Sequence, residues 1–156
     1  MKILQKSDRR LRQISKPVPP EEIGSQTVQD ILARMSRVLA TQADGVALAA
    51  PQIGEHLRLF IVGGEPELVF INPEITKLSK KKHLVEEGCL SVRWLYGEVK
   101  RAEKVRVTAY DAAGKKFVRH ASGLMAQIFQ HEIDHLDGIL FIDKAKNLHE
   151  IKPEHD

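Results

Sequence analysis

The amino-acid sequence predicts an α+β fold: a compact single domain of short, largely antiparallel strands around a central helix that carries His-Glu-Ile-Asp-His at residues 131–135. Two amphipathic helical patterns support this fold, one in the N-terminal third of the chain and one near its C-terminal end. Short apolar segments, separated by glycine and proline, lie between them. The order helix, strands, helix is typical of an α+β fold, because a parallel α/β sheet alternates strands with helices.

The first helix is predicted to begin at Thr27 and to extend to about Ala43. Thr27 is followed three residues later by Asp30, a spacing that resembles a capping box. Apolar residues then recur at helical spacing, at Val28, Ile31, Leu32, Met35, Val38 and Leu39. One face of this helix is therefore apolar and is expected to be buried.

The middle of the chain is predicted to form strands. Four short apolar segments are candidates, at residues 57–62, 68–72, 74–78 and 84–87. Residues 105–110 alternate apolar and polar side chains, which is typical of a half-buried strand. A turn at 111–114 then leads into a further strand at 115–121.

A second helix is predicted after Ser122, which can cap it, and before Gly138, which can terminate it. One face of this helix is formed by Leu124, Ile128, His131 and His135. The charged motif at 131–135 therefore lies on a helix that also has an apolar face.

The composition is that of one folded, soluble domain. Of the 156 residues, 42% are hydrophobic and 29% are charged, so a single domain over residues 1–156 with a short C-terminal tail is expected. The formal net charge of +3 is mildly basic and gives no reason to expect DNA as a partner. Disorder, a collagen-like chain and a membrane protein are excluded.

The cellular compartment is predicted from the cysteine and from the apolar runs. Cys89 is the one cysteine, so an intrachain disulfide is excluded. The first ten residues contain no apolar signal core, and no apolar run is long enough to span a membrane. We therefore expect a cytoplasmic protein with a reduced thiol and no membrane partner.

Residues 131–135 fit the motif His-Glu-x-x-His, and the predicted helix is the context that this motif requires. Because residues four apart lie one above the other on a helix, both imidazoles can reach one metal ion. Glu132 lies beside them, where a carboxylate can accept a proton from metal-bound water. The alternative is a pair of surface histidines on an amphipathic helix.

A catalytic metal site needs a third protein ligand. Downstream, Phe141 occupies the position at which one large class of proteases with this motif has a further histidine. Upstream, Cys89 can supply a thiolate, a soft anionic ligand suited to iron or zinc. A buried free cysteine and a nucleophilic cysteine are the alternatives, and the nucleophile would leave Glu132 without a role.

A third segment, residues 45–52, has the sequence Gly-Val-Ala-Leu-Ala-Ala-Pro-Gln. A run of small residues after a helix commonly indicates tight packing. The segment ends at Gln52, whose side-chain amide can donate a hydrogen bond to a developing oxyanion. Packing and catalysis are both open as roles for this segment.

Three segments together resemble, in order and spacing, the three motifs of the peptide deformylase family. They are residues 45–52, Glu-Gly-Cys-Leu-Ser at 87–91, and Gln-His-Glu-Ile-Asp-His-Leu-Asp-Gly at 130–138. The similarity covers nearly the whole chain, since residues 8–12 and 101–105 also look like that family. The resemblance implies a catalytic domain, a metal-dependent hydrolase that removes the formyl group from the N-terminal formylmethionine of nascent polypeptides and releases formate.

The resemblance also implies one divalent metal ion per chain, held by Cys89, His131 and His135. Ferrous iron is expected to be the physiological metal, and zinc, nickel or cobalt to be able to replace it. Metal-bound water is expected to attack the formyl carbon, with Glu132 as general base and then general acid. The Gln52 amide and the Leu90 backbone N–H are expected to stabilise the oxyanion.

For the N-formylmethionyl peptide, the resemblance implies a path along the backbone of Gly45, Ala47 and Gly88. The methionine side chain is expected to enter an apolar pocket, for which the candidates are Val46, Val85, Leu124, Ile128 and His131. Ordinary core packing is the alternative role for these side chains. The family resemblance also implies that Glu87 pairs with Arg101, and we expect Asp134 to make a structural hydrogen bond.

The chain departs from the family pattern at several positions near the predicted site. Ala47 stands where glycine is usual, Arg93 where proline is common, and Tyr96 where many members have arginine. Trp94 and Tyr96 are candidates for lid-like hydrophobic contacts. We expect these differences from the family to affect which substrate is preferred more than they affect the reaction that is catalysed.

Two alternative functions stay open at this point. One is a related metallo-hydrolase with altered substrate preference, and the other is a peptide-binding module of the same fold. Bacterial members often carry a longer basic C-terminal helix that docks on the ribosome, whereas 18 residues follow Gly138 here. We therefore expect transient proximity to the ribosome rather than stable docking.

Overall fold

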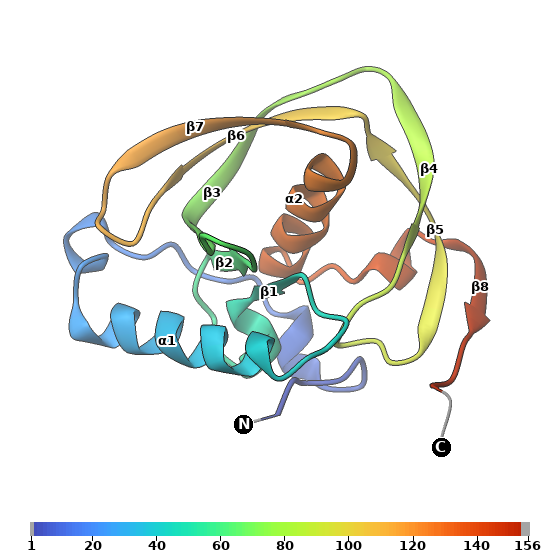
Figure 1. Ribbon diagram of the computed structural model, residues 1–156, viewed down its shortest axis with the longest axis horizontal. Helices are drawn as coiled ribbons and strands as arrows, with labels where there is room; N and C mark the ends of the chain where they lie inside the picture. The colour runs from blue at the N-terminus through green and yellow to red at the C-terminus, as the bar shows by residue number, and fades with distance from the viewer. Residues whose placement is uncertain (1, 154–156) are drawn as a thin grey trace.

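The computed structural model describes residues 2–153 (Figure 1). Within these residues the chain forms two α-helices, α1 (Gln26–Ala40) and α2 (Gly123–Leu136), and eight strands in two antiparallel sheets. The predicted α+β class is confirmed. The predicted domain over residues 1–156 also includes Met1 and residues 154–156, which lie outside the described residues.

The larger sheet has the strand order β1-β2-β3-β6-β7, and each neighbouring pair is antiparallel. Its strands are β1 (Ala47–Ala49), β2 (Leu59–Val62), β3 (Leu68–Leu78), β6 (Lys104–Tyr110) and β7 (Lys116–Ser122). The smaller sheet has the order β4-β5-β8 and is also antiparallel. Its strands are β4 (Lys82–Glu87), β5 (Leu95–Ala102) and β8 (Lys146–Glu150).

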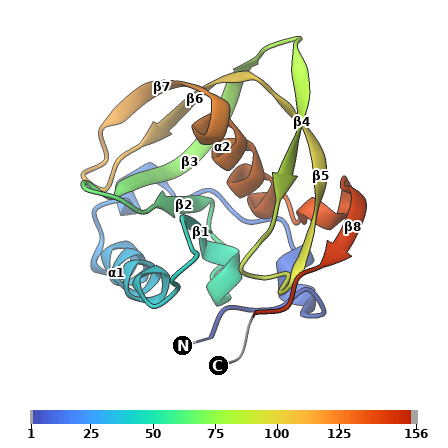
Figure 2. The same ribbon diagram turned by 45° about the vertical axis from the view of Figure 1, so that its right-hand side comes forward.

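Helix α2 lies between the two sheets, as Figures 1 and 2 show, and is the predicted central helix. Phe129 of α2 packs on the ring of Phe70, with 4.8 Å between centroids, and Phe70 stacks on Phe60 at 4.6 Å. Alternate residues of β2 point the other way, and Leu59 and Ile61 pack in the same core cluster as α1. This part of the larger sheet is therefore covered by a helix on each face.

Helix α1 begins and ends slightly before its predicted limits. Its cap is Ser25, whose hydroxyl accepts a hydrogen bond from the Val28 N–H at 3.3 Å, so the predicted cap at Thr27 is wrong. The helix ends at Ala40, and the Thr41 hydroxyl donates to the Val38 carbonyl at 2.7 Å. Among the described residues, no helix is long and apolar enough to cross a membrane.

Two of the predicted strands are one continuous strand, and three strands were not predicted. Residues 68–78 form β3, in which Pro73 lies at a shift of register against β6. Proline has no N–H to donate, so it is tolerated where the ladder is interrupted. The strands β1, β5 and β8 have no clear alternation of apolar and polar residues in the sequence.

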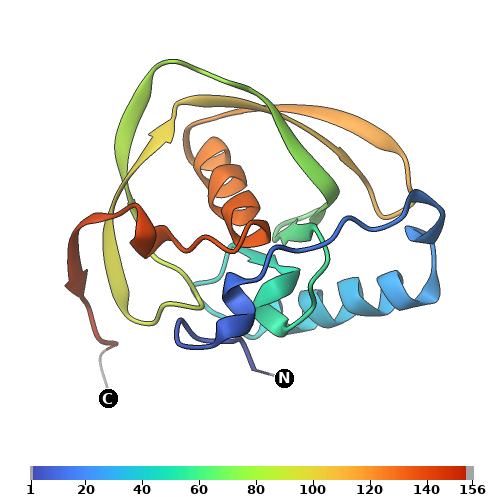
Figure 3. The ribbon, with the colours of Figure 1, turned by 180° about the vertical axis from the view of Figure 1, so that it is seen from behind.

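The C-terminal end of α2 packs against the N-terminal part of the chain, which Figure 3 shows from behind. The Ser15 N–H donates to the Leu136 carbonyl at 2.9 Å. Gly138 has a φ of +74°, and a Cβ at this position would lie 2.4 Å from the Arg12 carbonyl oxygen. The predicted end of the helix at Gly138 therefore requires glycine for two reasons, the left-handed backbone conformation and the lack of room for a Cβ. The predicted cap Ser122 precedes α2, but its side chain makes no capping hydrogen bond.

We expect Gly138→Ala to lower the free energy of unfolding by about 2 kcal/mol or more, because the methyl group meets backbone and the left-handed conformation is strained. Two matched variants separate these causes. Gly123 has a positive φ, but a Cβ there would meet no other atom, so Gly123→Ala should lower the free energy of unfolding by about 1 kcal/mol. Gly24 has no positive φ and also has open space, so Gly24→Ala should cost almost nothing. Urea denaturation measures all three, and equal effects at Gly138 and Gly24 would contradict this account.

Candidate metal centre and cavity

Helix α2 and the loop after β4 bring three metal-binding side chains together. Cys89 Sγ and one ring nitrogen from each of His131 and His135 lie within 4.8 Å of one another. Cys89 Sγ is 3.3 Å from His135 Nε2. The two histidines are one helical turn apart on α2, and their ring centroids are 5.1 Å apart. The convergence expected from the sequence is thus present.

The chemistry of these three groups suits a divalent cation. His131 Nδ1 lies 2.8 Å from Glu87 Oε1, so the Nδ1–H donates a hydrogen bond to that carboxylate and Nε2 is left to bind a metal ion. Burial is the main reason why the pKa of His135 lies well below its usual value, which favours the neutral ring that a ligand needs. A thiolate with two imidazoles can bind iron, zinc, nickel or cobalt, so the donor set does not identify the metal.

A buried ion-pair network holds the ligands in place. Arg101 of β5 donates to both carboxylate oxygens of Glu87, at 2.7 and 2.8 Å, and also to Asp134 at 2.7 Å. The Arg101 and Glu87 side chains are 3% and 2% exposed. Burial works to raise the pKa of Glu87, but hydrogen bonds from Arg101 and His131 outweigh it and lower this pKa to about 2. An ionised Glu87 therefore connects β4 to β5 and α2, and Asp134 makes the structural bond expected of it.

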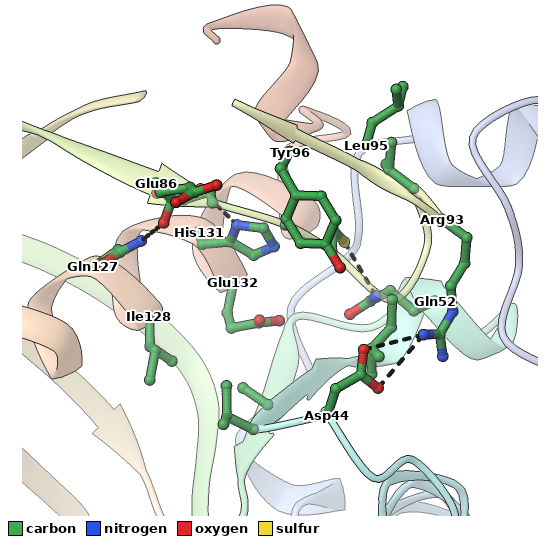
Figure 4. Close-up of a pocket in the computed structure, with 18 of the residues that line it drawn as sticks. Asp44, Gln52, Glu86, Arg93, Leu95, Tyr96, Gln127, Ile128, His131 and Glu132 are labelled. Carbon is green, nitrogen blue, oxygen red and sulfur yellow. Dashed lines mark hydrogen bonds and ion pairs between the residues drawn. The ribbon is translucent and has the colours of Figure 1, made fainter. Parts of the chain in front are cut away.

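Glu132 lies beside the three ligand residues and points into a cavity (Figure 4). Its side chain is buried, and Oε2 has no hydrogen-bond partner among the described residues. Burial raises the pKa of this carboxyl to about 7. A carboxyl with a pKa near neutrality can both accept and release a proton.

Two residues of the cavity lining carry hydrogen-bond donors close to Cys89. Gln52 is in a 3₁₀ turn, η3 (Ala50–Ile53), and its Oε1 accepts from the Ala49 N–H at 2.9 Å. Its Nε2 donates to Ser91 Oγ at 3.0 Å. The backbone N–H of Leu90 has no acceptor within the part of the chain that the structure describes. Both Gln52 and Leu90 line the cavity.

The cavity has a volume of about 290 Å³. Residues expected from the sequence to contact a substrate line it, namely Gly45, Val46, Ala47, Gly88, Leu124, Ile128 and His131. Val85, also expected there from the sequence, lies in β4 opposite Val99, and within β4 the lining of the cavity begins one residue later, at Glu86. Val46 and Leu124 are more than half exposed and therefore lie at the mouth.

Other residues of the lining were not singled out from the sequence. They are Asp44, Glu86, Val92, Leu95 and Gln127. Gln127 could have been found, because it lies four residues before His131 and so shares its helical face. The others lie in loops or at strand ends, where no periodic pattern points to a cavity.

Three residues that depart from the family pattern, Arg93, Trp94 and Tyr96, line the cavity in the loop before β5 and at the start of that strand. Tyr96 lies over the cavity in Figure 4. The Arg93 guanidinium is 4.7 Å from the centre of the Trp94 ring and forms an ion pair with Asp44 at 3.2 Å. Arg93 thus joins the loop before β1 to the loop before β5 (Figure 4).

A buried glutamate next to paired histidines, at the base of a cavity, is the arrangement of metal-dependent hydrolases. Comparison with known proteins gives the family. The model of the Polypeptide deformylase family matches residues 1–150, and the chain belongs to this family of metal-dependent enzymes.

Relatives and solved structures agree with this membership. The peptide deformylase of Pelotomaculum thermopropionicum is 42% identical over 156 residues, covering 99% of this chain and 97% of that protein. The crystal structure of a peptide deformylase from Legionella pneumophila superposes with a TM-score of 0.86 at 43% identity, covering 94% of this chain and 86% of that one. A class I type b peptide deformylase from Acinetobacter baumannii gives a TM-score of 0.87 at 35% identity, covering 92% and 98%.

We expect Arg101→Met to lower the free energy of unfolding by about 3–5 kcal/mol, because Glu87 would be left as a buried, unpaired charge. Lys81→Met is the matched control: Lys81 pairs with Glu103 at 3.5 Å but is 79% exposed, so its loss should cost less than about 1 kcal/mol. The double variant Arg101→Met/Glu87→Gln should recover part of the loss. Denaturant unfolding measures each variant, and similar costs at Arg101 and Lys81 would rule out the bracing role.

Proposed function

We propose that this chain removes the formyl group from the N-terminal formylmethionine of nascent polypeptides and releases formate. The observation that carries this proposal is the buried, unpartnered Glu132 carboxylate beside Cys89, His131 and His135, at the base of a cavity. The family model and the relatives named peptide deformylase support it. They do not favour a peptide-binding module without catalysis, and an intact Glu132 also argues against one.

Cys89, His131 and His135 are the residues that would hold one divalent metal ion, for which we propose ferrous iron with zinc, nickel or cobalt as substitutes. When bound, such an ion polarises a carbonyl oxygen and lowers the pKa of a water molecule. Glu87 supports this role, because its carboxylate accepts a hydrogen bond from the Nδ1–H of His131 and so orients the ring for binding through Nε2.

Glu132 is the proton carrier in this proposal. Its free Oε2 accepts a proton from the attacking water, and the carboxyl then delivers that proton to the departing amine. Because the pKa of Glu132 is raised to about 7 by burial, neither transfer is strongly uphill near neutral pH.

Gln52 and Leu90 stabilise the negative charge that develops on the formyl oxygen. Gln52 and Leu90 both line the cavity next to Cys89, and we assign the Gln52 side-chain N–H and the Leu90 backbone N–H as the donors. One donor of this kind is typically worth about 3 kcal/mol of barrier. These groups are fixed before the substrate binds, so no reorganisation is needed during the reaction.

The cavity accommodates the rest of the substrate. We assign the peptide backbone to the path beside Gly45, Ala47 and Gly88, and the methionine side chain to the apolar wall formed by Ile128 and Leu124. Val46 lies at the mouth, where it can cover the methionine from solvent. Since the substrate is the start of a nascent chain, we propose that the enzyme acts in the cytoplasm, with transient proximity to the ribosome.

Glu132→Gln is expected to keep the metal ion and to lower the rate of formate release roughly 10²- to 10⁴-fold, because the amide cannot accept the proton. The measurement is anaerobic formate release from formyl-Met peptides, with metal analysis of the same samples. Glu74→Gln, an exposed carboxylate of β3, is the control and should match the unmodified enzyme. Near-normal deformylation by a metal-loaded Glu132→Gln enzyme would show that the general base is a different group.

Cys89→Ser is expected to weaken metal retention, because a hydroxyl is a harder and less acidic ligand than a thiol. Cobalt-substituted enzyme provides the measurement, since sulfur-to-cobalt charge-transfer absorption should disappear in the variant. If metal content and spectrum are both unchanged, Cys89 is not a ligand.

A further inference from the structure

Ser91 is a buried hydroxyl that the reaction proposed above does not use. Its side chain lies in the turn after Cys89 and is 0% exposed. Its Oγ accepts a hydrogen bond from Gln52 Nε2 at 3.0 Å, across 39 positions in the sequence. The hydroxyl therefore contacts the amide that is assigned to the oxyanion, but not the metal ligands through its side chain.

The orientation of the Gln52 amide is fixed by its two partners. A backbone N–H can only donate, so the atom that faces the Ala49 N–H at 2.9 Å is the oxygen, and the nitrogen faces Ser91. A primary amide is planar and has two N–H bonds. Once Ser91 accepts one of them, the direction of the other is set.

The second N–H of Gln52 faces Cys89. It donates a weak hydrogen bond to Cys89 Sγ, at 3.7 Å from Nε2. Gln52 is 98% buried and lines the cavity next to Cys89, so this N–H lies beside the metal-binding groups, where we place the formyl oxygen. Without the Ser91 hydroxyl, the bond from the Ala49 N–H to Oε1 is the remaining strong contact of the amide, and the broad minimum of the terminal torsion of glutamine lets Nε2 change direction about it.

We propose that Ser91 is a positioning residue that aims the second N–H of Gln52 at the developing oxyanion; this inference rests on the proposed deformylase function. It acts on the rate of the chemical step and not on peptide binding, because the bond from Gln52 strengthens only as charge develops on the oxygen. The backbone N–H of Ser91, which lies 3.4 Å from Cys89 Sγ, is unaffected by a change of its side chain.

The test is a double-mutant cycle in zinc- or cobalt-loaded enzyme, with formyl-Met peptides as substrate. Ser91→Ala should lower kcat about tenfold with KM nearly unchanged, and Gln52→Ala should lower kcat about 10²- to 10³-fold. In the Gln52→Ala background, Ser91→Ala should change kcat less than about twofold, because the group through which it acts is absent. The cobalt spectrum should be the same in all four proteins.

Ser25→Ala is the control for stability, since it removes the cap of α1 and lowers stability without altering the cavity. Its kcat should equal that of the unmodified enzyme. If Ser91→Ala does not fold, Ser91→Cys, which keeps a side chain of similar shape but is a much weaker hydrogen-bond acceptor, takes its place in the cycle.

Equal loss of kcat from Ser91→Ala in both backgrounds would overturn the proposal, as would a normal kcat in metal-loaded Ser91→Ala. Loss of the cobalt spectrum with loss of activity would also overturn it, because Ser91 would then serve the metal site. Failure of the proposed function is distinguished from these outcomes, since the unmodified, metal-loaded enzyme would then release no formate.

Discussion

The ion pair between Arg101 and Glu87 is the contact on which the geometry of the site depends. Glu87 ends β4, Arg101 lies in β5, and both are almost inaccessible to water. The same carboxylate also binds His131, and the same guanidinium binds Asp134 of α2. A buried pair of this kind contributes little net stability, but loss of one partner is costly, so it specifies one arrangement of strand and helix.

Five consecutive residues then perform four separate tasks. Glu87 orients a histidine, Cys89 presents its sulfur, Leu90 presents an unused N–H, and Ser91 holds Gln52. The segment can do this because it is the point where a strand becomes a tight turn, and side chains and N–H groups there point in several directions. Gly88 allows the turn to pass close under Tyr96, whose ring would lie 2.6 Å from a Cβ at that position.

The parts of the fold that were predicted from sequence are those with a local signal. Helical spacing placed His131 and His135 on one face of α2, and the spacing of apolar residues located α1. By contrast, β1 is three small buried residues, and all five residues of β8 are exposed, so neither has an alternating pattern. These strands form because β2 and β5 offer free edges, which is a property of the folded chain and not of a segment.

The candidate site, like the fold, was predicted from the sequence only where a residue carries a local signal. The meeting of Cys89 with two histidines was expected from three ordered motifs, since each motif carries its own residue types. The family resemblance made Val85 a candidate for the apolar pocket, whereas in the structure it lies in β4 opposite Val99, one residue before the lining begins. The contact between Ser91 and Gln52 joins two motifs whose separation in the sequence gives no hint of it.

Cys89 and His131 are separated by 42 positions, and the strands β5, β6 and β7 lie between them in the chain. A cation shared between these residues would close that loop in the manner of a cross-link, and it would bind the folded chain in preference to the unfolded one. Resistance of the enzyme to heat and proteases is therefore expected to rise with the free metal concentration.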